Sequence, residues 1–292
     1  MNRSIQSCLA SVAVLCASLS TIQALPSSAN IQLWFEADAG VTTNGSGNVS
    51  TWADQSGNGN NATNLTVANE PLWIGNALNG KPVLRFDGVN DELSSLNDVN
   101  LTNGLSIFII AKNATRKNYN GLFRIGAVPY TDPSDLEVYW QAGTTDAGSG
   151  NAIFTVNRCC GSSFGALQGS DNRPAVGNYY VYDVVTSGSA GTQRVNAVVG
   201  PSVSGINVRP LSANKAHLGI GYGGVSTSGL LSGDIAEVIV YNSALSTSDR
   251  NYVESYLADK YGLTIPEADT IAYLGMSVAA LLLVRHRRHS NA

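Results

Sequence analysis

Carboxylates at strand spacing are the first side chains in this sequence that suit catalysis. Hydrolysis of a glycosidic bond needs two carboxylates about 5 to 10 Å apart on one groove, and residues i and i+2 of a strand share a face. Residues 36–38 (Glu-Ala-Asp) and 135–137 (Asp-Leu-Glu) have this spacing, but no third carboxylate extends either pattern. A regular strand would point Asp234 and Glu237 to opposite faces. The sequence therefore assigns no catalytic residue.

Oxygen-rich turns are the second chemical feature, and hard cations such as calcium prefer oxygen ligands. Residues 54–58 copy the first half of an EF-hand loop, but Leu65 occupies its twelfth position and excludes that motif. The turn at 87–91 has the sequence Asp-Gly-Val-Asn-Asp. It predicts a calcium site on Asp87, Asn90 and Asp91, with calcium as the cofactor. The alternative is that these side chains only cap the turn.

Two predicted strands have faces rich in polar and aromatic side chains, which suit recognition of sugars. Residues 136–141 and 193–199 are each read as one strand with alternating faces. If both faces line one concave sheet, they form a shallow glycan-binding groove. The alternative is an ordinary solvent-facing sheet surface. The groove residues would be Glu137, Tyr139, Gln141, Arg194 and Asn196.

Histidine and cysteine usage limits other chemistry. Between the two ends of the chain the one histidine is His217, so a Ser–His–Asp triad would have to include it. No GxSxG motif accompanies it, and we interpret His217 as a strand residue. Cys159 and Cys160 are adjacent. They form either a strained, labile disulfide or two free thiols.

Short apolar segments must position these residues. About a dozen runs rich in β-branched and aromatic residues alternate with Asn-Gly or Asp-Gly turns, which is typical of an antiparallel β-sandwich or jelly roll. Ser246 begins a capping-box pattern, and Val253, Leu257 and Tyr261 recur at helical spacing before Gly262. We expect this helix to pack on the sandwich. Three tryptophans near turns are expected mainly in the core: Trp34, Trp52 and Trp73.

The two ends of the 292-residue chain differ from its middle. Residues 1–24 combine Arg3, an apolar run and small residues, as secretory signal peptides do. Residues 265–292 contain a short apolar stretch followed by an arginine-rich end. We expect export through the Sec translocon, with this tail as a membrane anchor or a sorting signal. The middle, residues 25–264, then forms one domain.

The charge balance of that domain argues against nucleic acid as a partner. The two ends of the chain contain four arginines (Arg3 and the three after position 284) and two acidic residues (Glu267 and Asp269), which are not counted in the domain. Thus 13 of 17 basic and 19 of 21 acidic residues remain, a net charge of −6. A phosphate backbone would repel this surface.

Two stretches resemble a known family. Residues 51–63 (TWADQSGNGNNAT) with 80–93 (GKPVLRFDGVNDEL), and residues 232–263 at the other end, resemble LamG-like, concanavalin A-like jelly-roll domains. The resemblance implies a jelly roll closed by a C-terminal helix. It also implies calcium in some relatives. It does not assign a function, because this fold carries lectin-like binders, sugar hydrolases and adhesive modules.

The tail resembles a PEP-CTERM sorting signal, although Ala268 stands where the second proline usually occurs. That resemblance implies an exosortase-like processing enzyme, an inner-membrane intermediate and final placement at the cell surface or in an exopolysaccharide matrix. The sequence thus predicts a secreted, non-catalytic protein that binds a polysaccharide or glycoconjugate. The alternatives are a glycoside hydrolase or lyase of the same fold and a purely structural matrix protein.

Overall fold

The structure is a computed structural model. It describes residues 24–266 except 116, 118, 127–135, 142–152, 159–164, 169–173, 189, 205–210 and 222–228. Cys159 and Cys160, almost all of the expected signal peptide and the apolar tail stretch therefore lie outside the described residues. Among the residues that are described, no helix is both long and apolar enough to cross a membrane.

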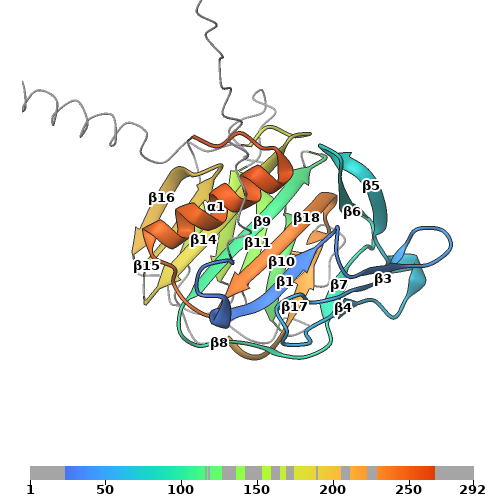
Figure 1. The fold of residues 1–292 in the computed structure, drawn as a ribbon, viewed down its shortest axis with the longest axis horizontal. Helices are drawn as coiled ribbons and strands as arrows, with labels where there is room; N and C mark the ends of the chain where they lie inside the picture. Colours follow the sequence, from blue (N-terminus) through green and yellow to red (C-terminus); the bar gives the residue numbers. More distant parts are fainter. Residues whose placement is uncertain are drawn as a thin grey trace, which may run out of the picture.

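Two antiparallel sheets face each other and form a β-sandwich, with one helix on the outer face of the first sheet (Figure 1). This first sheet, called sheet A, confirms the expected all-β class. Its strands run in the order β16-β15-β14-β9-β18-β6-β5, and β1 pairs with β18 beside β6. Their bounds are β1 (Ile31–Glu36), β5 (Leu72–Leu78), β6 (Lys81–Asp87), β9 (Leu105–Asn113), β14 (Tyr179–Ser187), β15 (Ala190–Val195), β16 (Val198–Ser204) and β18 (Ser232–Tyr241).

The second sheet, sheet B, runs in the order β13-β12-β11-β10-β17-β7-β4-β3-β2, and β8 pairs with β17. Two short 3-10 helices, Ser28–Asn30 and Val67–Asn69, lie in connections. The strand bounds in sheet B are β2 (Val41–Thr43), β3 (Val49–Trp52), β4 (Ala62–Thr63), β7 (Leu93–Ser95), β8 (Val99–Leu101), β10 (Asn120–Gly126), β11 (Leu136–Gln141), β12 (Ile153–Arg158), β13 (Gly165–Gln168) and β17 (Leu211–Leu218).

Alternation along the strands builds two hydrophobic layers. In β1, Leu33 and Phe35 point between the sheets, where they join Trp52 of β3 in the main core. In β9, Phe108 and Ile110 point the other way, into a second cluster under the helix. Because both of its faces are covered, β9 is almost continuously apolar.

Helix α1 (Thr247–Tyr261) confirms the helix expected from the sequence. The Ser246 side chain accepts a hydrogen bond from the Asp249 backbone N–H, and Gly262 ends the helix in the left-handed conformation. Val253, Leu257 and Tyr261 are buried against sheet A. The Asn79-Gly80 turn between β5 and β6 reaches the same end, because Asn79 Nδ2 donates to the Tyr261 carbonyl at 2.8 Å.

The expected single strand over 193–199 is wrong. Asn196 and Ala197 have φ values of 50° and 61°, so the chain reverses there and forms the hairpin β15–β16. Two successive residues with positive φ make the tight turn that suits a two-residue hairpin. Arg194 and Asn196 therefore do not share the face of one strand.

The expected opposite orientation of Asp234 and Glu237 is also wrong. The register between β18 and β9 shifts between Ile235 and Glu237, which marks a β-bulge. Ile235 packs in the core, whereas Ala236 packs in the cluster under α1. The extra residue places both carboxylates on the outer face of sheet A.

Candidate functional site

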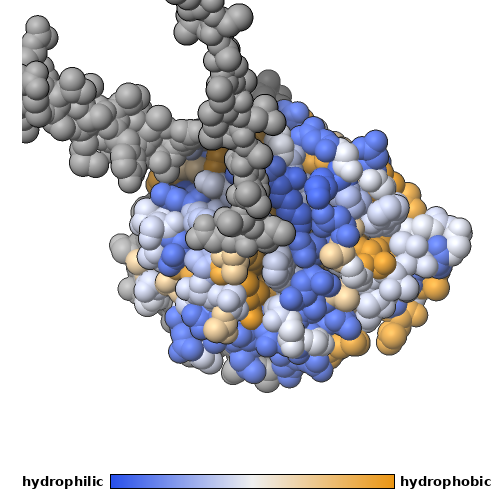
Figure 2. Space-filling view, viewed as in Figure 1, coloured by the Kyte–Doolittle hydropathy of each residue, from blue (hydrophilic) through white to orange (hydrophobic). Residues whose placement is uncertain are grey.

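Strand β5 is an edge strand with a hollow on each side. Leu72 pairs with Arg85 of β6, and the next residue, Trp73, pairs with Leu84, so the two side chains leave opposite faces. Both are exposed for their type, at 38% and 39%. Figure 2 shows hydrophobic surface at this end of the molecule, where β3–β6 lie. Edge strand β5 thus separates two surface hollows of different chemistry.

The first hollow, called the aromatic hollow, has a volume of about 230 Å³. Trp73 lines it, and its indole N–H donates to the Ala37 carbonyl at 3.0 Å, which fixes the ring. The expectation that Trp73 belongs to the core is wrong, whereas Trp52 is fully buried as expected. The rest of the lining comes from Ala37, Asp38, Ala39, Gly40, Val41 and Thr43.

Asp38 places a fixed carboxylate beside this ring. Lys81 Nζ lies 2.9 Å from Asp38 Oδ2, and Lys260 Nζ lies 3.3 Å from Oδ1. Burial acts to raise the pKa of Asp38, but the two lysines outweigh it and lower the pKa overall. The hollow therefore combines an immobilised aromatic ring with an ionised hydrogen-bond acceptor.

The second hollow, called the charged hollow, has a volume of about 680 Å³ and lies on the outer face of sheet A. Asp234 is its central group and accepts Arg85 Nε at 2.8 Å and Tyr179 Oη at 2.5 Å, while Lys112 Nζ lies 2.6 Å away. These residues are paired in register across four neighbouring strands. Burial opposes ionisation of Asp234, but its three partners outweigh burial and lower its pKa.

The predicted calcium turn borders this charged hollow. Asp91 Oδ2 accepts the Asp87 N–H at 2.8 Å, and Asp87 Oδ1 accepts the Val89 N–H at 2.7 Å. Asn90 turns away and donates to the Ala68 carbonyl. Burial, with the charge of Asp87, raises the pKa of Asp91 to about 6.

The fit of this turn to calcium is partial. One oxygen of each carboxylate, Asp87 Oδ2 and Asp91 Oδ1, takes no hydrogen bond from the described residues. Calcium takes six to eight oxygen ligands. Within the described ranges, no three acidic, histidine or cysteine side chains form a metal-binding group. The turn thus offers two free carboxylate oxygens, and other ligands would have to come from backbone, water or a bound molecule.

The five predicted groove residues do not form one groove. Glu137 and Tyr139 lie in β11 of sheet B and are buried, at 0% and 4% exposure. Gln141 ends that strand, and its side chain is outside the described part. Glu137 belongs to a polar row across sheet B, in which successive strands pair it with Arg124, Arg124 with His217, and His217 with Ser94.

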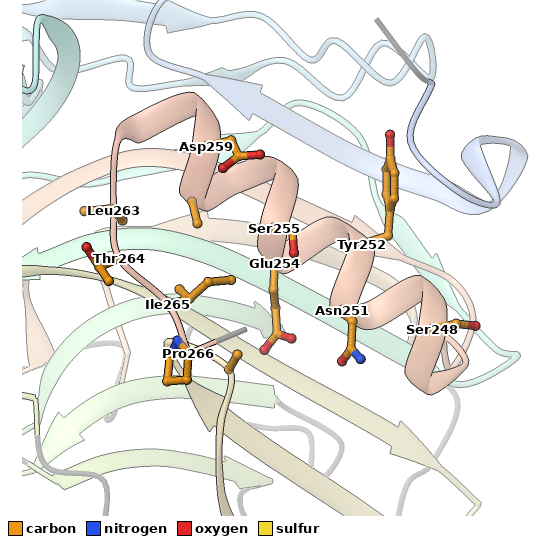
Figure 3. A pocket seen from close by; sticks show the side chains of 12 residues that line it. Ser248, Asn251, Tyr252, Glu254, Ser255, Asp259, Leu263, Thr264, Ile265 and Pro266 are labelled. Atoms are coloured by element: carbon orange, nitrogen blue, oxygen red, sulfur yellow. The ribbon is translucent and has the colours of Figure 1, made fainter. Parts of the chain in front are cut away.

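Arg194 lies in β15 of sheet A and Asn196 in the turn that follows it, and both have structural partners there. Arg194 Nη1 donates to Asn251 Oδ1 and Glu254 Oε2, both at 2.8 Å, which ties α1 to the sheet. Asn196 Oδ1 accepts the Val181 N–H at 2.8 Å. Figure 3 shows Asn251 and Glu254 pointing from α1 toward the strands beneath it. The hollow of about 630 Å³ in that view is mainly lined by α1 and residues 263–266.

Two carboxylates on the outer face of sheet A, Glu36 and Glu237, are bridged by one lysine. Glu36 and Glu237 are opposite each other in β1 and β18, and Lys260 contacts both of them. Burial raises the pKa of Glu237. This arrangement fixes the end of α1 on sheet A.

Comparison with known proteins identifies the fold. No family model matches the chain, and no curated protein matches it. Among solved structures, domain 4 of AbnA, an extracellular GH43 arabinanase from Geobacillus stearothermophilus solved with arabinotriose, has a TM-score of 0.53 at 15% identity. The match covers 75% of this chain and 96% of that one.

Two further structures agree. An arabinofuranosidase complexed with arabinofuranosyl-alpha-1,2-xylobiose has a TM-score of 0.56 at 17% identity, covering 73% of this chain and 51% of that one. The binding domain of Paraclostridial Mosquitocidal Protein 1 has a TM-score of 0.54 at 12% identity, with coverages of 78% and 53%. The chain shares their β-sandwich fold. At these identities the likeness concerns fold alone.

Sequence reasoning missed most residues that line the hollows of the sandwich. Arg85 and Lys112 are basic residues inside otherwise largely apolar strand patterns, in VLRF and SIFIIAK. Arg124 is another, in GLFRIG, and it is fully buried. A charge at a strand position with apolar neighbours is the available signal, because burying it requires a partner.

Proposed function

We propose that this protein is an exported glycan-binding protein that does not cleave the glycan it binds, and that the aromatic hollow at Trp73 binds the sugar. The observation that carries the proposal is a half-exposed indole ring, held by its N–H bond to Ala37, beside the ionised Asp38. The fold supports the proposal as well, since two of the proteins that share it were solved with bound sugars.

The chemistry of sugars matches this pair of groups. A sugar ring has an apolar C–H face that can pack on an aromatic ring, and hydroxyl groups that donate to a carboxylate. Trp73 supplies the flat apolar surface, and Asp38 supplies a charged acceptor, which forms stronger hydrogen bonds than a neutral one. Lys81 and Lys260 hold Asp38 in place, so binding does not have to order it.

Trp73→Ala tests the aromatic hollow. We expect affinity for the best ligand on a polysaccharide array to fall at least about tenfold, since truncating an aromatic anchor costs about 2 kcal/mol or more. Titration calorimetry measures the loss. Leu65→Ala is the matched control, because Leu65 is 99% exposed and lines neither hollow. Equal affinities of Trp73→Ala and the unchanged protein would overturn the site.

We include calcium in the proposal, bound by Asp87 and Asp91 at the edge of the charged hollow. Millimolar calcium should raise the melting temperature of the unchanged protein and leave that of Asp91→Asn unchanged. Because the pKa of Asp91 is about 6, calcium competes with a proton there, so the rise should be larger at pH 7.5 than at pH 5. If the melting temperature of the unchanged protein at pH 7.5 is the same with calcium and with a chelator, the calcium site is wrong.

The ion pairs of the carboxylates on sheet A favour glycan binding over glycosidic hydrolysis. Glu36 and Glu237 share one lysine, and Asp234 is bonded to Arg85, Lys112 and Tyr179. Neither the pair Glu36 and Glu237 nor Asp234 is arranged about an open groove as the general acid and base of a glycosidase would be. An assay for new reducing ends on the bound polysaccharide separates the two functions, because binding releases none. A protein that binds no glycan would instead have the structural matrix role.

We also propose that residues 1–24 direct export through the Sec translocon and that residues 265–292 hold the chain in the inner membrane until an exosortase-like enzyme removes them. The support is the sequence pattern of both ends. Mass spectrometry of protein from its native host tests this, and a mature mass that includes residues 271–292 would contradict the cleavage.

A further inference from the structure

Ser94 and His217 form a hydrogen-bonded pair on sheet B that the proposed glycan binding does not use. Strands β7 and β17 are neighbours, and the two residues are opposite each other in register. Ser94 Oγ lies 2.8 Å from His217 Nδ1. Ser94 is partly exposed, whereas the imidazole is only 5% exposed. A reachable hydroxyl is therefore bonded to a ring that the fold holds in one place.

The second ring nitrogen decides which atom carries the proton. His217 Nε2 lies 3.2 Å from the Gly126 carbonyl oxygen, which can only accept a hydrogen bond. Nε2 must then be protonated, and the Nδ1 lone pair accepts the Ser94 hydroxyl proton. Burial lowers the pKa of His217 to about 4, and the positive charges of Arg124 and Lys215 act in the same direction, so the ring is neutral at pH 7.

Charges of both signs surround the pair. The Ser94 hydroxyl can also donate to Glu92 Oε1 at 3.4 Å, a longer contact than its 2.8 Å distance to His217 Nδ1, and Glu92 Oε1 lies 4.0 Å from Nδ1. Arg124 is opposite His217 on the other neighbouring strand and is fully buried. Directly opposed residues share a face, so Arg124 adds positive charge on the face of sheet B that carries His217.

We propose that Ser94 is a nucleophile and His217 its general base, acting on carboxylic esters with a small acyl group. A hydroxyl bonded to a base whose other nitrogen is oriented by an acceptor is the arrangement that acyl transfer requires. The acyl group must be small because Ser94 is only partly exposed.

The atoms balance in two steps. Ser94 Oγ attacks the ester carbonyl carbon as its proton passes to His217 Nδ1, and the alcohol leaves with that proton. Water then attacks the acyl-serine and gives one proton to Nδ1. The carboxylic acid leaves, and the proton on Nδ1 returns to Ser94 Oγ. No oxidant, reductant or metal enters either step.

Labelling with a fluorophosphonate probe tests the nucleophile directly. Peptide mapping by mass spectrometry should find one adduct on Ser94 in the unchanged protein and none in Ser94→Ala. His217→Gln should label at least about tenfold more slowly, since a positioned base contributes 10²–10⁴-fold. Ser255→Ala, which removes an exposed hydroxyl on α1, should label like the unchanged protein.

The pH dependence separates catalysis from a structural role of this pair. Hydrolysis of 4-nitrophenyl acetate that depends on Ser94 should decline below about pH 4, where His217 becomes protonated, rather than below the usual 6.5. Melting curves confirm that each variant is folded. The absence of a Ser94 adduct in folded, unchanged protein overturns the proposal, and so does a rate that is the same in Ser94→Ala.

Discussion

At the scale of single residues, the sandwich accommodates buried titratable side chains in two ways: one is ionised and paired, and the other is neutral. Asp234 is 1% exposed and stays ionised because Arg85, Lys112 and Tyr179 all donate to it or neutralise it. His217 is almost as buried but stays neutral, with Ser94 and Gly126 as hydrogen-bond partners. Both solutions avoid the cost of an isolated buried charge, which is several kcal/mol.

The neutral state of His217 predicts how stability responds to acid. The pKa is about 4 in the folded chain and 6.5 when unfolded, so between these values only the unfolded chain takes up the proton. Stability should therefore fall as pH drops from 6.5 to 4, by about 3 kcal/mol in total. Denaturant unfolding at each pH measures it. Because carboxylates also titrate in this range, His217→Gln is the control, and it should lose most of the slope.

At the scale of elements, the strands and the helix were predictable wherever a local pattern was sufficient. Residues 136–141 form a strand with the expected bounds, and α1 begins after Ser246 and ends before Gly262 as its caps indicate. The hairpin at 196–197 was not predictable, since Ala197 gives no turn signal of its own. The bulge in β18 also has no glycine or proline to mark it.

The turn at Ala197 predicts a stabilising substitution. An alanine with a φ of 61° is strained by its Cβ, and glycine is not. Ala197→Gly should raise the free energy of unfolding by about 1 kcal/mol, measured by urea denaturation. Ala190→Gly is the matched control, because Ala190 lies in β15 without a positive φ and should be destabilised. A loss of stability in Ala197→Gly would show that the turn is not strained.

The candidate site was predictable only where its signal is local in the sequence. The turn at 87–91 was recognisable because its signal lies in five consecutive residues, and in the structure it borders the charged hollow. The prediction of one groove formed by residues 137–141 and 194–196 was wrong, because an alternating strand pattern does not indicate which sheet the strand joins. Trp73 likewise has a core-like sequence context, and only its place on edge strand β5 exposes it.

At the scale of the whole molecule, α1 is part of the fold rather than an addition to it. It covers an apolar cluster on sheet A that includes Phe108, Ile110 and Val181. Ion pairs fix it at both ends, through Arg250 with Asp183 and through Lys260 with Glu237. The aromatic hollow depends on it too, since Lys260 also holds Asp38.

Removal of residues 246–266 should therefore abolish cooperative folding. Each large apolar side chain that leaves its site costs about 1.5–3 kcal/mol, and several are lost at once, against a total stability of about 5–15 kcal/mol. We expect binding of a hydrophobic dye and loss of the sharp thermal transition. Leu65→Ala, at an exposed position, should melt like the unchanged protein. A truncated chain that keeps its transition would contradict the integral role of α1.

The pairing of β1 with β18 also sets an order of events during synthesis. Strand β1 leaves the ribosome early, yet its partner ends at Tyr241, about two hundred residues later. Until then β1 has no neighbour in its sheet, and the adjoining α1 does not yet exist. Sheet A can therefore be completed only after β18 has been made, late in synthesis.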